Sequence, residues 1–452
     1  MVNLVSIGLF VAWFGLETYG ASALIVASST LLLSIVGQWM INAVSRYFYE
    51  FQENFFRTLW SYGLLILLMT VVIIPLGLSA GERMVNFTLV INLFVLTFCY
   101  NFSLEFIRMK RQVFVYGISI LIEAVASVAT GYILSQRDTG VINPVYLCIA
   151  VSMYLPLLFH LLMIRPNLSR ATVTQGRMKE IFHFGYPMSI SSLFGQVIFF
   201  GARYFLGLFF GLKEVGIFST LYDISQRGAT FILNTLTGAS QVIIFKEYGM
   251  HNLEKVNKYL NKQINLILQF SVIVALLFFN AYPYIMQVAG KSGLEDYKFM
   301  LVFVSIIVSI NRIKSGTFDL ILQLEKNTLG ITRSTLLGAV ISVVPGILIV
   351  KYYGIWGAVC SMLLSYCVSL FYSYVLVRRM RIAYFNLNAS VIKKNLGVYA
   401  LVALVLLASL LSFFRFESPA GNIVLLFFVV ISALFSIYTN STWYTRGGKE
   451  SV

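Results

Sequence analysis

The feature that most constrains this chain is a succession of apolar segments, most of them about 20 residues long, that runs through the whole sequence. A helix needs about 20 mostly apolar residues to cross the roughly 30 Å hydrocarbon core of a bilayer. Fourteen such segments can be marked, with short connections between them. They cover approximately residues 2–14, 19–43, 57–80, 85–107, 112–134, 143–164, 181–210, 215–244, 262–289, 297–324, 330–350, 354–377, 396–413 and 421–438. The sequence therefore predicts an all-α polytopic membrane protein.

The composition agrees with this class. Of the 452 residues, 59% are hydrophobic and 11% are charged, whereas soluble domains have about 45–50% and 25%. A water-soluble enzyme is therefore excluded. The net charge of +15 would suggest nucleic-acid binding in a soluble chain. Here the positive-inside rule is the first explanation to test, because it places Lys and Arg in the cytoplasmic loops of membrane proteins.

The basic residues give the chain an orientation. When the loops are assigned alternately to two sides, 22 Lys and Arg residues fall on one side and seven on the other. This bias predicts that both termini are cytoplasmic, together with the loops at 165–180, 245–261 and 378–395. Most of the net charge then reflects topology, and no nucleic-acid partner is predicted.

Tests for catalysis are negative. The four cysteines lie in apolar stretches, and the three histidines are scattered singly. Gly290-Lys291-Ser292 resembles the end of a phosphate-binding loop, but Ile285 stands where the first glycine of that motif belongs. No metal-ligand spacing or nucleophile elbow is present either. We predict a protein that is not an enzyme, with no catalytic residues, no metal and no cofactor.

The chain contains an internal repeat. The segment 14–20 recurs as 210–216, at an offset of 196, and both copies lie in a turn with glycines at matching positions. We therefore predict six helices in 1–164, a cytoplasmic loop at 165–180, six helices in 181–377, and a trailing helix pair with a tail in 378–452. Because the repeat register puts the start of the first helix before Met1, we expect that helix to be incomplete here. We expect apolar residues to precede it.

Polar residues inside apolar spans are costly, so their positions are informative. Several of them recur at steps of three and four, which places them on one helical face. The stripes contain Gln38, Asn42 and Arg46 in the second span, Glu123 in the fifth, Gln196 and Arg203 in the seventh, Asp223, Arg227 and Asn234 in the eighth, and Arg312 and Asp319 in the tenth.

The charges in these spans do not balance. Four cations (Arg203, Arg227, Arg312 and Lys314) accompany three acids (Glu123, Asp223 and Asp319). Asp223 and Arg227 are four residues apart and can pair, while Arg312 and Asp319 share a face. Lys314 has no obvious local partner and could belong to the cytoplasmic rim. Hydrogen bonding between helices explains the serines and threonines. For the charged residues we favour a weakly cationic cavity that takes an anionic ligand.

Three short motifs resemble a known family. The turn at 13–20, the segment Asn42-Ala43-Val44-Ser45-Arg46-Tyr47-Phe48 and the turn Gly354-Ile355-Trp356-Gly357-Ala358 are similar to those of bacterial polysaccharide flippases. These belong to the multidrug/oligosaccharidyl-lipid/polysaccharide exporter superfamily. The resemblance implies two six-helix lobes around a central cavity, working by alternating access in the inner membrane.

The resemblance also implies a substrate and partners. The substrate would be an undecaprenyl-diphosphate-linked oligosaccharide unit of O-antigen, capsule or exopolysaccharide, with cavity cations engaging its diphosphate or acidic sugars. Further partners would be membrane lipids, the polysaccharide polymerase and the chain-length regulator. The residues predicted to bind substrate are Arg203, Arg227, Arg312, Lys314, Asp223, Asp319, Glu123, Gln38, Asn42, Arg46, Gln196 and Asn234.

Three other functions stay open. A peptidoglycan-precursor flippase is a near alternative. A drug–cation antiporter would need uncompensated intramembrane acids for coupling, whereas this chain has an excess of cations. A membrane polysaccharide polymerase would need a substantial external loop for its chemistry, and the external connections here are short.

Overall fold

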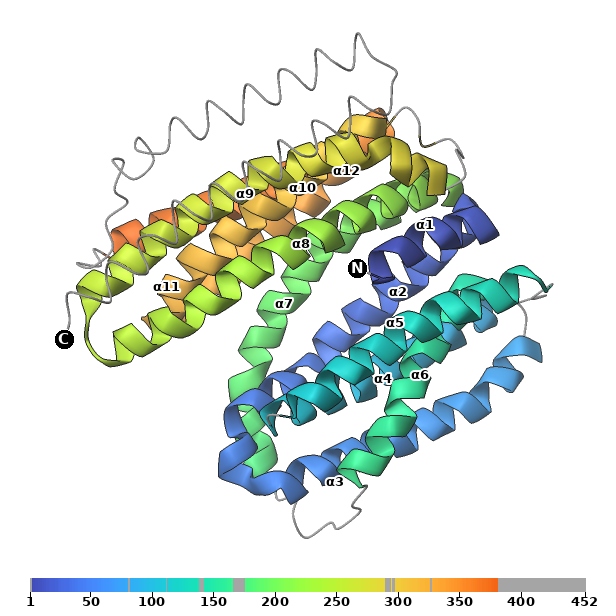
Figure 1. Ribbon diagram of the computed structural model, residues 1–452, viewed down its shortest axis with the longest axis horizontal. Coiled ribbons are helices and arrows are strands. Elements are labelled where there is room, and N and C mark those ends of the chain that lie inside the picture. Colours follow the sequence, from blue (N-terminus) through green and yellow to red (C-terminus); the bar gives the residue numbers. More distant parts are fainter. Residues whose placement is uncertain are drawn as a thin grey trace. The chain divides into compact units, whose positions relative to one another are not determined.

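The computed structural model describes residues 2–79, 82–110, 112–137, 142–165, 175–288, 294, 297–325 and 327–380. The regular secondary structure within these ranges is helical (Figure 1). The helices, in chain order, are α1 (Val2–Phe14), α2 (Leu16–Val36), α3 (Gln38–Ser79), α4 (Glu82–Met109), α5 (Val113–Ser135), α6 (Pro144–Ile164), α7 (Gln175–Phe209), α8 (Leu212–Gly249), α9 (Leu253–Val288), α10 (Lys298–Ile313), the π turn η3 (Lys314–Phe318), α11 (Asp319–Leu324) and α12 (Thr328–Arg379).

The predicted fold class is confirmed: the chain is an all-α polytopic membrane protein. In the described part, nine helical segments are long and apolar enough to cross a membrane. The eleventh and twelfth predicted spans are joined in α12, where Gly354 interrupts the helical backbone with φ 56° and ψ −132°. The two trailing spans, 396–413 and 421–438, lie outside the described residues.

The second and third predicted spans are divided differently from the prediction. The second span, expected to be continuous over 19–43, is interrupted at Gly37 between α2 and α3. Glycine weakens a helix, and a Cβ at Gly37 would lie 2.7 Å from the Phe98 ring. After this interruption α3 runs for 42 residues, through the expected loop at 44–56. Arg46, the one basic residue of that loop, is therefore helical.

The described residues form two compact units. Unit 1 contains α1–α7, the start of α8 as far as Thr220 and α12 as far as Ser365. Unit 2 contains α8 from Leu221, α9 as far as Gln287, α10, η3, α11, and α12 from Tyr366. The predicted division at 164, 181 and 377 stays a prediction.

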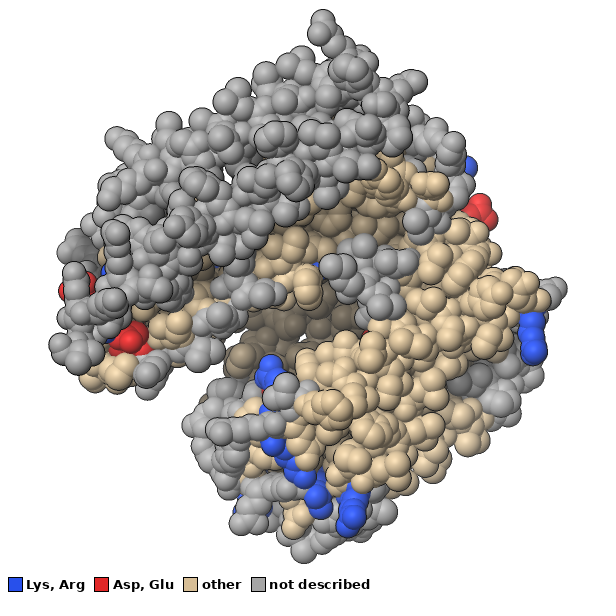
Figure 2. Space-filling model, viewed as in Figure 1, with Lys and Arg blue, Asp and Glu red and all other residues tan. Residues whose placement is uncertain are grey.

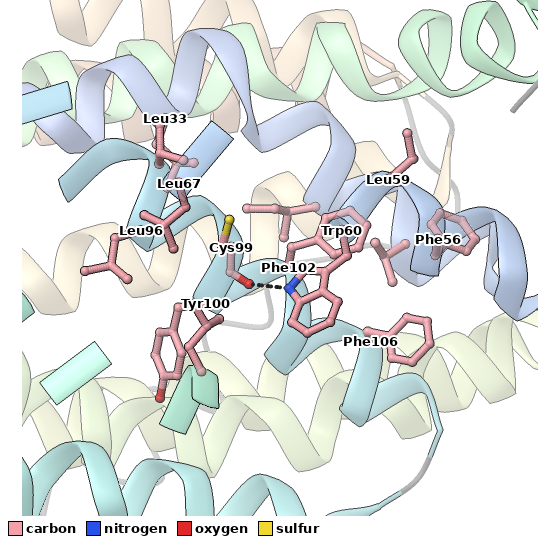
Figure 3. Close-up of a cluster of buried hydrophobic side chains, with 14 of the residues drawn as sticks. Leu33, Phe56, Leu59, Trp60, Leu67, Leu96, Cys99, Tyr100, Phe102 and Phe106 are labelled. Atoms are coloured by element: carbon pink, nitrogen blue, oxygen red, sulfur yellow. Dashed lines mark hydrogen bonds between the residues drawn. The ribbon is translucent and has the colours of Figure 1, made fainter. Parts of the chain in front are cut away.

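Unit 1 has a core built by aromatic side chains. Helix α3 packs along α4 and also contacts α7, while α5 packs on α6 and α1. Between α3 and α4, the Trp60 indole Nε1 donates a hydrogen bond to the Cys99 backbone oxygen at 3.2 Å (Figure 3). Phe56, Phe102 and Phe106 are buried in the same cluster. Because Trp60 is fully buried, this bond satisfies a donor that would otherwise be costly.

The internal repeat is visible in the backbone. Gly15, before α2, has φ 82°, and Gly211, before α8, has φ 91°. The hydrogen bond from Tyr19 N to Gly15 O has its counterpart, 196 residues later, from Val215 N to Gly211 O. Both turns need a left-handed backbone that favours glycine. The matching geometry supports duplication over a chance recurrence of small residues.

Basic side chains gather at one end of unit 1 (Figure 2). Two basic side chains of this unit lie over aromatic rings: Lys110 Nζ is 5.3 Å from the centre of the Phe106 ring, and Arg177, in the predicted cytoplasmic segment 165–180, is 5.5 Å from that of Phe51. Arg108 pairs with Glu105. Aromatic rings and cations of this kind are typical of the membrane–water interface.

Candidate functional site

The tenth predicted span carries a buried ion pair at a π turn. Lys314 Nζ lies 2.6 Å from Asp319 Oδ2, and the two residues are only 5% and 6% exposed. The backbone N–H of Asp319 donates to the Lys314 carbonyl, five residues earlier, which is the hydrogen bond that defines a π turn. Within unit 2 the turn connects α10 to α11.

This pair corrects the sequence-based expectation. Asp319 was expected on a face with Arg312, and Lys314 was expected to have no local partner. In a regular α-helix, residues five apart lie about 140° apart around the axis. The π turn holds one extra residue, so Lys314 and Asp319 meet as residues four apart do in an α-helix. A helical-wheel analysis assumes a constant angle per residue and therefore assigns the wrong partner.

Side chains from three other helices complete the polar cluster around the turn. From α12, Ser373 Oγ donates to Asp319 Oδ1 at 3.1 Å. From α9, Gln263 Nε2 donates to the Gly316 carbonyl at 2.8 Å. From α8, Ser240 Oγ donates to Gln263 Oε1 at 2.8 Å. We call these residues and the Lys314–Asp319 pair the π-turn cluster.

Ser240, Gln263 and Ser373 were not among the predicted site residues. A signal for Gln263 was present in the sequence, because Gln263, Asn265 and Gln269 are polar residues in an otherwise apolar span. All three are buried. Polar side chains buried in a membrane span need partners, so this group could have been included. No comparable signal marks Ser373.

Arg312 lies on α10 two residues before the turn. Its side chain is half-buried, and its Nε is a buried atom with no hydrogen-bond partner among the described residues. Asp319, the carboxylate expected to balance it, is taken by Lys314. Within the described part of unit 2, Arg312 is thus a guanidinium in a membrane span that no carboxylate neutralises.

The stripe on α8 is less uniformly buried than expected. Asp223 is half-buried, whereas Arg227 and Asn234 are exposed. All three lie in unit 2. The expected Asp223–Arg227 pairing stays a prediction.

In unit 1, the predicted residues have separate local environments. Arg203 on α7 is 2% exposed, with its guanidinium 5.4 Å and 5.2 Å from the ring centres of Phe199 and Phe200. On α3, Gln38 Nε2 donates to Asn42 Oδ1 at 3.1 Å. Gln196 is half-buried on α7, and the Arg46 side chain lies outside what the structure describes.

A second polar cluster surrounds Glu123, between α4, α5 and α6. The Tyr100 hydroxyl donates to Glu123 Oε2 at 2.7 Å. His160, which the sequence shows only as an isolated histidine, is fully buried beside it. Its Nδ1 is 2.7 Å from Ser103 Oγ and its Nε2 is 2.8 Å from Ser119 Oγ. Its ring also stacks on Tyr100.

The predicted cationic residues are therefore divided between the two units. Arg203 belongs to unit 1, while Arg227, Arg312 and Lys314 belong to unit 2. That they line one cavity stays a prediction. Over the described ranges, no group of three His, Cys, Asp or Glu side chains is arranged to hold a metal ion.

Comparisons with known proteins identify the fold. No protein-family model matches the chain, and no curated protein sequence matches it. A solved structure of a multidrug resistance MATE family transporter of the MOP superfamily, in an inward-facing conformation, aligns with a TM-score of 0.67 at 16% identity, over 85% of this chain and 95% of that one. The chain has the fold of MOP-superfamily transporters.

Two further structures agree with this assignment. The lipid II flippase MurJ, in an inward closed conformation, aligns with a TM-score of 0.65 at 13% identity, over 98% of this chain and 97% of that one. A MOP superfamily transporter from Pyrococcus furiosus Vc1 aligns with a TM-score of 0.56 at 15% identity, over 84% and 91%. The shared property is the fold, which hosts more than one kind of substrate.

Proposed function

We propose that this chain is a flippase that moves undecaprenyl-diphosphate-linked oligosaccharide units from the inner to the outer leaflet of the bacterial cytoplasmic membrane by alternating access. The observation that carries the proposal is the charge arrangement at the tenth span. Lys314 neutralises Asp319, which leaves the Nε of Arg312 without a hydrogen-bond partner among the described residues. A guanidinium in a membrane span is costly unless it faces protein, water or a ligand of opposite charge.

The chemistry of Arg312 suits a diphosphate. A guanidinium donates two parallel hydrogen bonds to phosphate oxygens and keeps its charge at any physiological pH. Arg227, exposed on α8 in the same unit, supplies a second positive charge that suits phosphate or acidic sugars. The Gln38–Asn42 pair in unit 1 offers hydrogen-bonding groups for sugar hydroxyls. Membrane lipids, the polymerase and the chain-length regulator are proposed partners.

The alternatives differ in the charge they require. A drug–cation antiporter needs a carboxylate free to bind a cation, yet Asp319 pairs with Lys314 and Glu123 accepts a hydrogen bond from Tyr100. A peptidoglycan-precursor flippase needs the same diphosphate chemistry as our proposal, and MurJ aligns over almost the whole chain. An experiment therefore has to distinguish these two functions by comparing lipids that carry different sugars.

The experiment is a flipping assay with purified protein in proteoliposomes. Fluorescent undecaprenyl-diphosphate oligosaccharide, lipid II and an organic cation are tested separately, with a membrane-impermeant quencher reporting the leaflet. We expect the oligosaccharide lipid to move fastest. Arg312→Gln should slow its flipping about tenfold or more, because a hydrogen bond to a charged group contributes about 1.5–3 kcal/mol. Arg312→Lys should keep part of the rate.

The matched control is Arg333→Gln, since Arg333 is an exposed arginine on α12. It should flip at the wild-type rate. A wild-type protein that moves lipid II but not the oligosaccharide lipid would assign the chain to the peptidoglycan precursor. Arg312→Gln flipping at the full rate would overturn the role of Arg312.

A further inference from the structure

The π turn is held by contacts that exist only in its own register. The Lys314–Asp319 pair spans five residues, and Gln263 holds the Gly316 carbonyl in the middle of the turn. In a continuous α-helix the two charged side chains would lie about 140° apart and could not meet. The ion pair and the π turn therefore depend on each other. π turns are rare and concentrate at functional sites.

The same turn leaves two polar groups unsatisfied. Ser315 Oγ and Thr317 Oγ1 are buried and have no hydrogen-bond partner among the described residues. Earlier in the same membrane span, Ser305 and Ser309 each donate to the carbonyl four residues before them. Serine and threonine commonly make this bond in α-helices. An α register through the turn would offer it to Ser315 and Thr317 as well, through the carbonyls of Asn311 and Ile313.

The two registers thus have opposite advantages. The π register satisfies the charges and leaves the hydroxyls of Ser315 and Thr317 unpaired, while the α register would offer these hydroxyls a backbone acceptor and would separate the charges. An element with two such arrangements can be shifted by a small change at either set of contacts. Both sets of contacts are buried, so each affects the free energy of its register, because an unpaired polar group in a low-dielectric environment is costly.

We propose that residues 314–318 form a register switch that Lys314 and Asp319 hold in the π state. When Lys314 leaves Asp319, the turn relaxes to the α register. The helix before the turn then rotates by about 100° relative to the helix after it, which is the angle of one residue. Arg312, two residues before the turn, is thereby re-aimed relative to Asp319 and Ser373. Only the ligand of Arg312 rests on the proposed function. The register switch itself does not depend on that function.

The register can be measured as a distance along the helix. Nitroxide labels are placed at Phe303→Cys and Gln323→Cys, two exposed positions on either side of the turn, with the exposed Cys360 and Cys367 replaced by Ser. Pulsed electron paramagnetic resonance on the full chain in nanodiscs, without substrate, gives the label spacing. The Lys314→Gln/Asp319→Asn variant removes both charges at once, so no lone buried charge endangers folding. Its spacing should exceed that of the wild type by at least about 1.5 Å, the rise of one residue.

Three further variants test the mechanism. Deleting Ser315 removes the extra residue, so Lys314 and Asp319 become four apart in an ordinary α-helix and keep their ion pair. This deletion variant should retain the wild-type label spacing. Neutralising Lys314 and Asp319 in the deletion variant should leave that spacing unchanged. The swap Lys314→Asp/Asp319→Lys restores the pair and should restore the wild-type spacing.

Flipping of the oligosaccharide lipid provides a second readout. The Ser315 deletion should insert into the membrane normally and lose most of its flipping rate, because it cannot change register. The switch is overturned if the neutral variant keeps the wild-type spacing. Its part in transport is overturned if the deletion flips at the wild-type rate. A wild type that flips none of the tested lipids would refute the proposed function, whereas the spacing results would still decide the switch.

Discussion

Gly20 and Gly216, which occupy equivalent positions of the internal repeat, pack against each other's turns within unit 1. A Cβ at Gly20 would overlap the Leu212 carbonyl and lie 2.8 Å from Gly216 N. A Cβ at Gly216 would overlap the Leu16 carbonyl. The contacts are reciprocal, because Leu16 and Leu212 are also equivalent positions. The beginnings of α2 and α8 therefore approach as closely as two backbones can, and only glycine permits it.

We expect Gly20→Ala and Gly216→Ala each to destabilise the protein by about 1–3 kcal/mol, since the methyl group meets backbone that cannot move away. Thermal unfolding in detergent, followed by tryptophan fluorescence, measures the effect. Gly195→Ala is the matched control: Gly195 lies inside α7 with no atom within 4 Å of a Cβ. It should be neutral or slightly stabilising. Equal stability of all three variants would contradict the close approach.

The Lys314–Asp319 pair should show strong coupling in a double-mutant cycle. Asp319→Asn alone or Lys314→Met alone leaves one buried charge unpaired and should cost about 3–5 kcal/mol. The double variant Lys314→Met/Asp319→Asn should cost clearly less than the sum of the single changes. Thermal unfolding of the four proteins gives the coupling free energy. Additive single effects would mean that the two side chains do not interact.

His160 should stabilise the cluster between α4, α5 and α6 through both ring nitrogens. His160→Phe replaces the imidazole with an aromatic ring that has no nitrogen, and leaves the Ser103 and Ser119 hydroxyls without their histidine partner. We expect a loss of about 1–3 kcal/mol. His183→Phe is the comparison, because His183 is exposed on α7. If the two variants unfold at the same temperature, His160 contributes nothing through these bonds.

The α8 stripe makes a prediction about transport. If Arg227 contacts phosphate or acidic sugar, the double variant Asp223→Asn/Arg227→Gln should be stable and inserted but should export no surface polysaccharide. The double change leaves no lone charge, which removes the main reason for either single variant to misfold. Arg227→Lys should retain part of the export, because the charge survives without the bidentate geometry. Normal export by the double variant would show that the two residues have only a structural role.

The bias in Lys and Arg makes a prediction about topology. Single cysteines placed in the segments 165–180, 245–261 and 378–395 should resist a membrane-impermeant thiol reagent in intact cells, and should react after the membrane is opened. If any two of these segments are labelled from outside, the predicted orientation is wrong. The native Cys360 and Cys367 are exposed and are replaced by Ser in this experiment.

Local patterns in the sequence determined much of this protein. The apolar segments predicted the fold class, because a membrane span must satisfy its backbone hydrogen bonds within its own helix. The glycine turns at Gly15 and Gly211 were also predictable, since the left-handed backbone they need is a property of a few adjacent residues. The predicted spans 85–107, 112–134 and 143–164 lie within three residues of the bounds of α4, α5 and α6, because apolar periodicity is a local property of each segment.

Tertiary structure decided which polar groups meet. Lys314 pairs with Asp319 because a π turn changes the angular register of the helix, and Gln263 from another helix holds the turn at Gly316. His160 joins Ser103 and Ser119 because three helices pack at that point. Neither arrangement follows from spacing along the chain. Spacing specifies neighbours only within a regular helix, whereas these contacts depend on a local irregularity and on packing between helices.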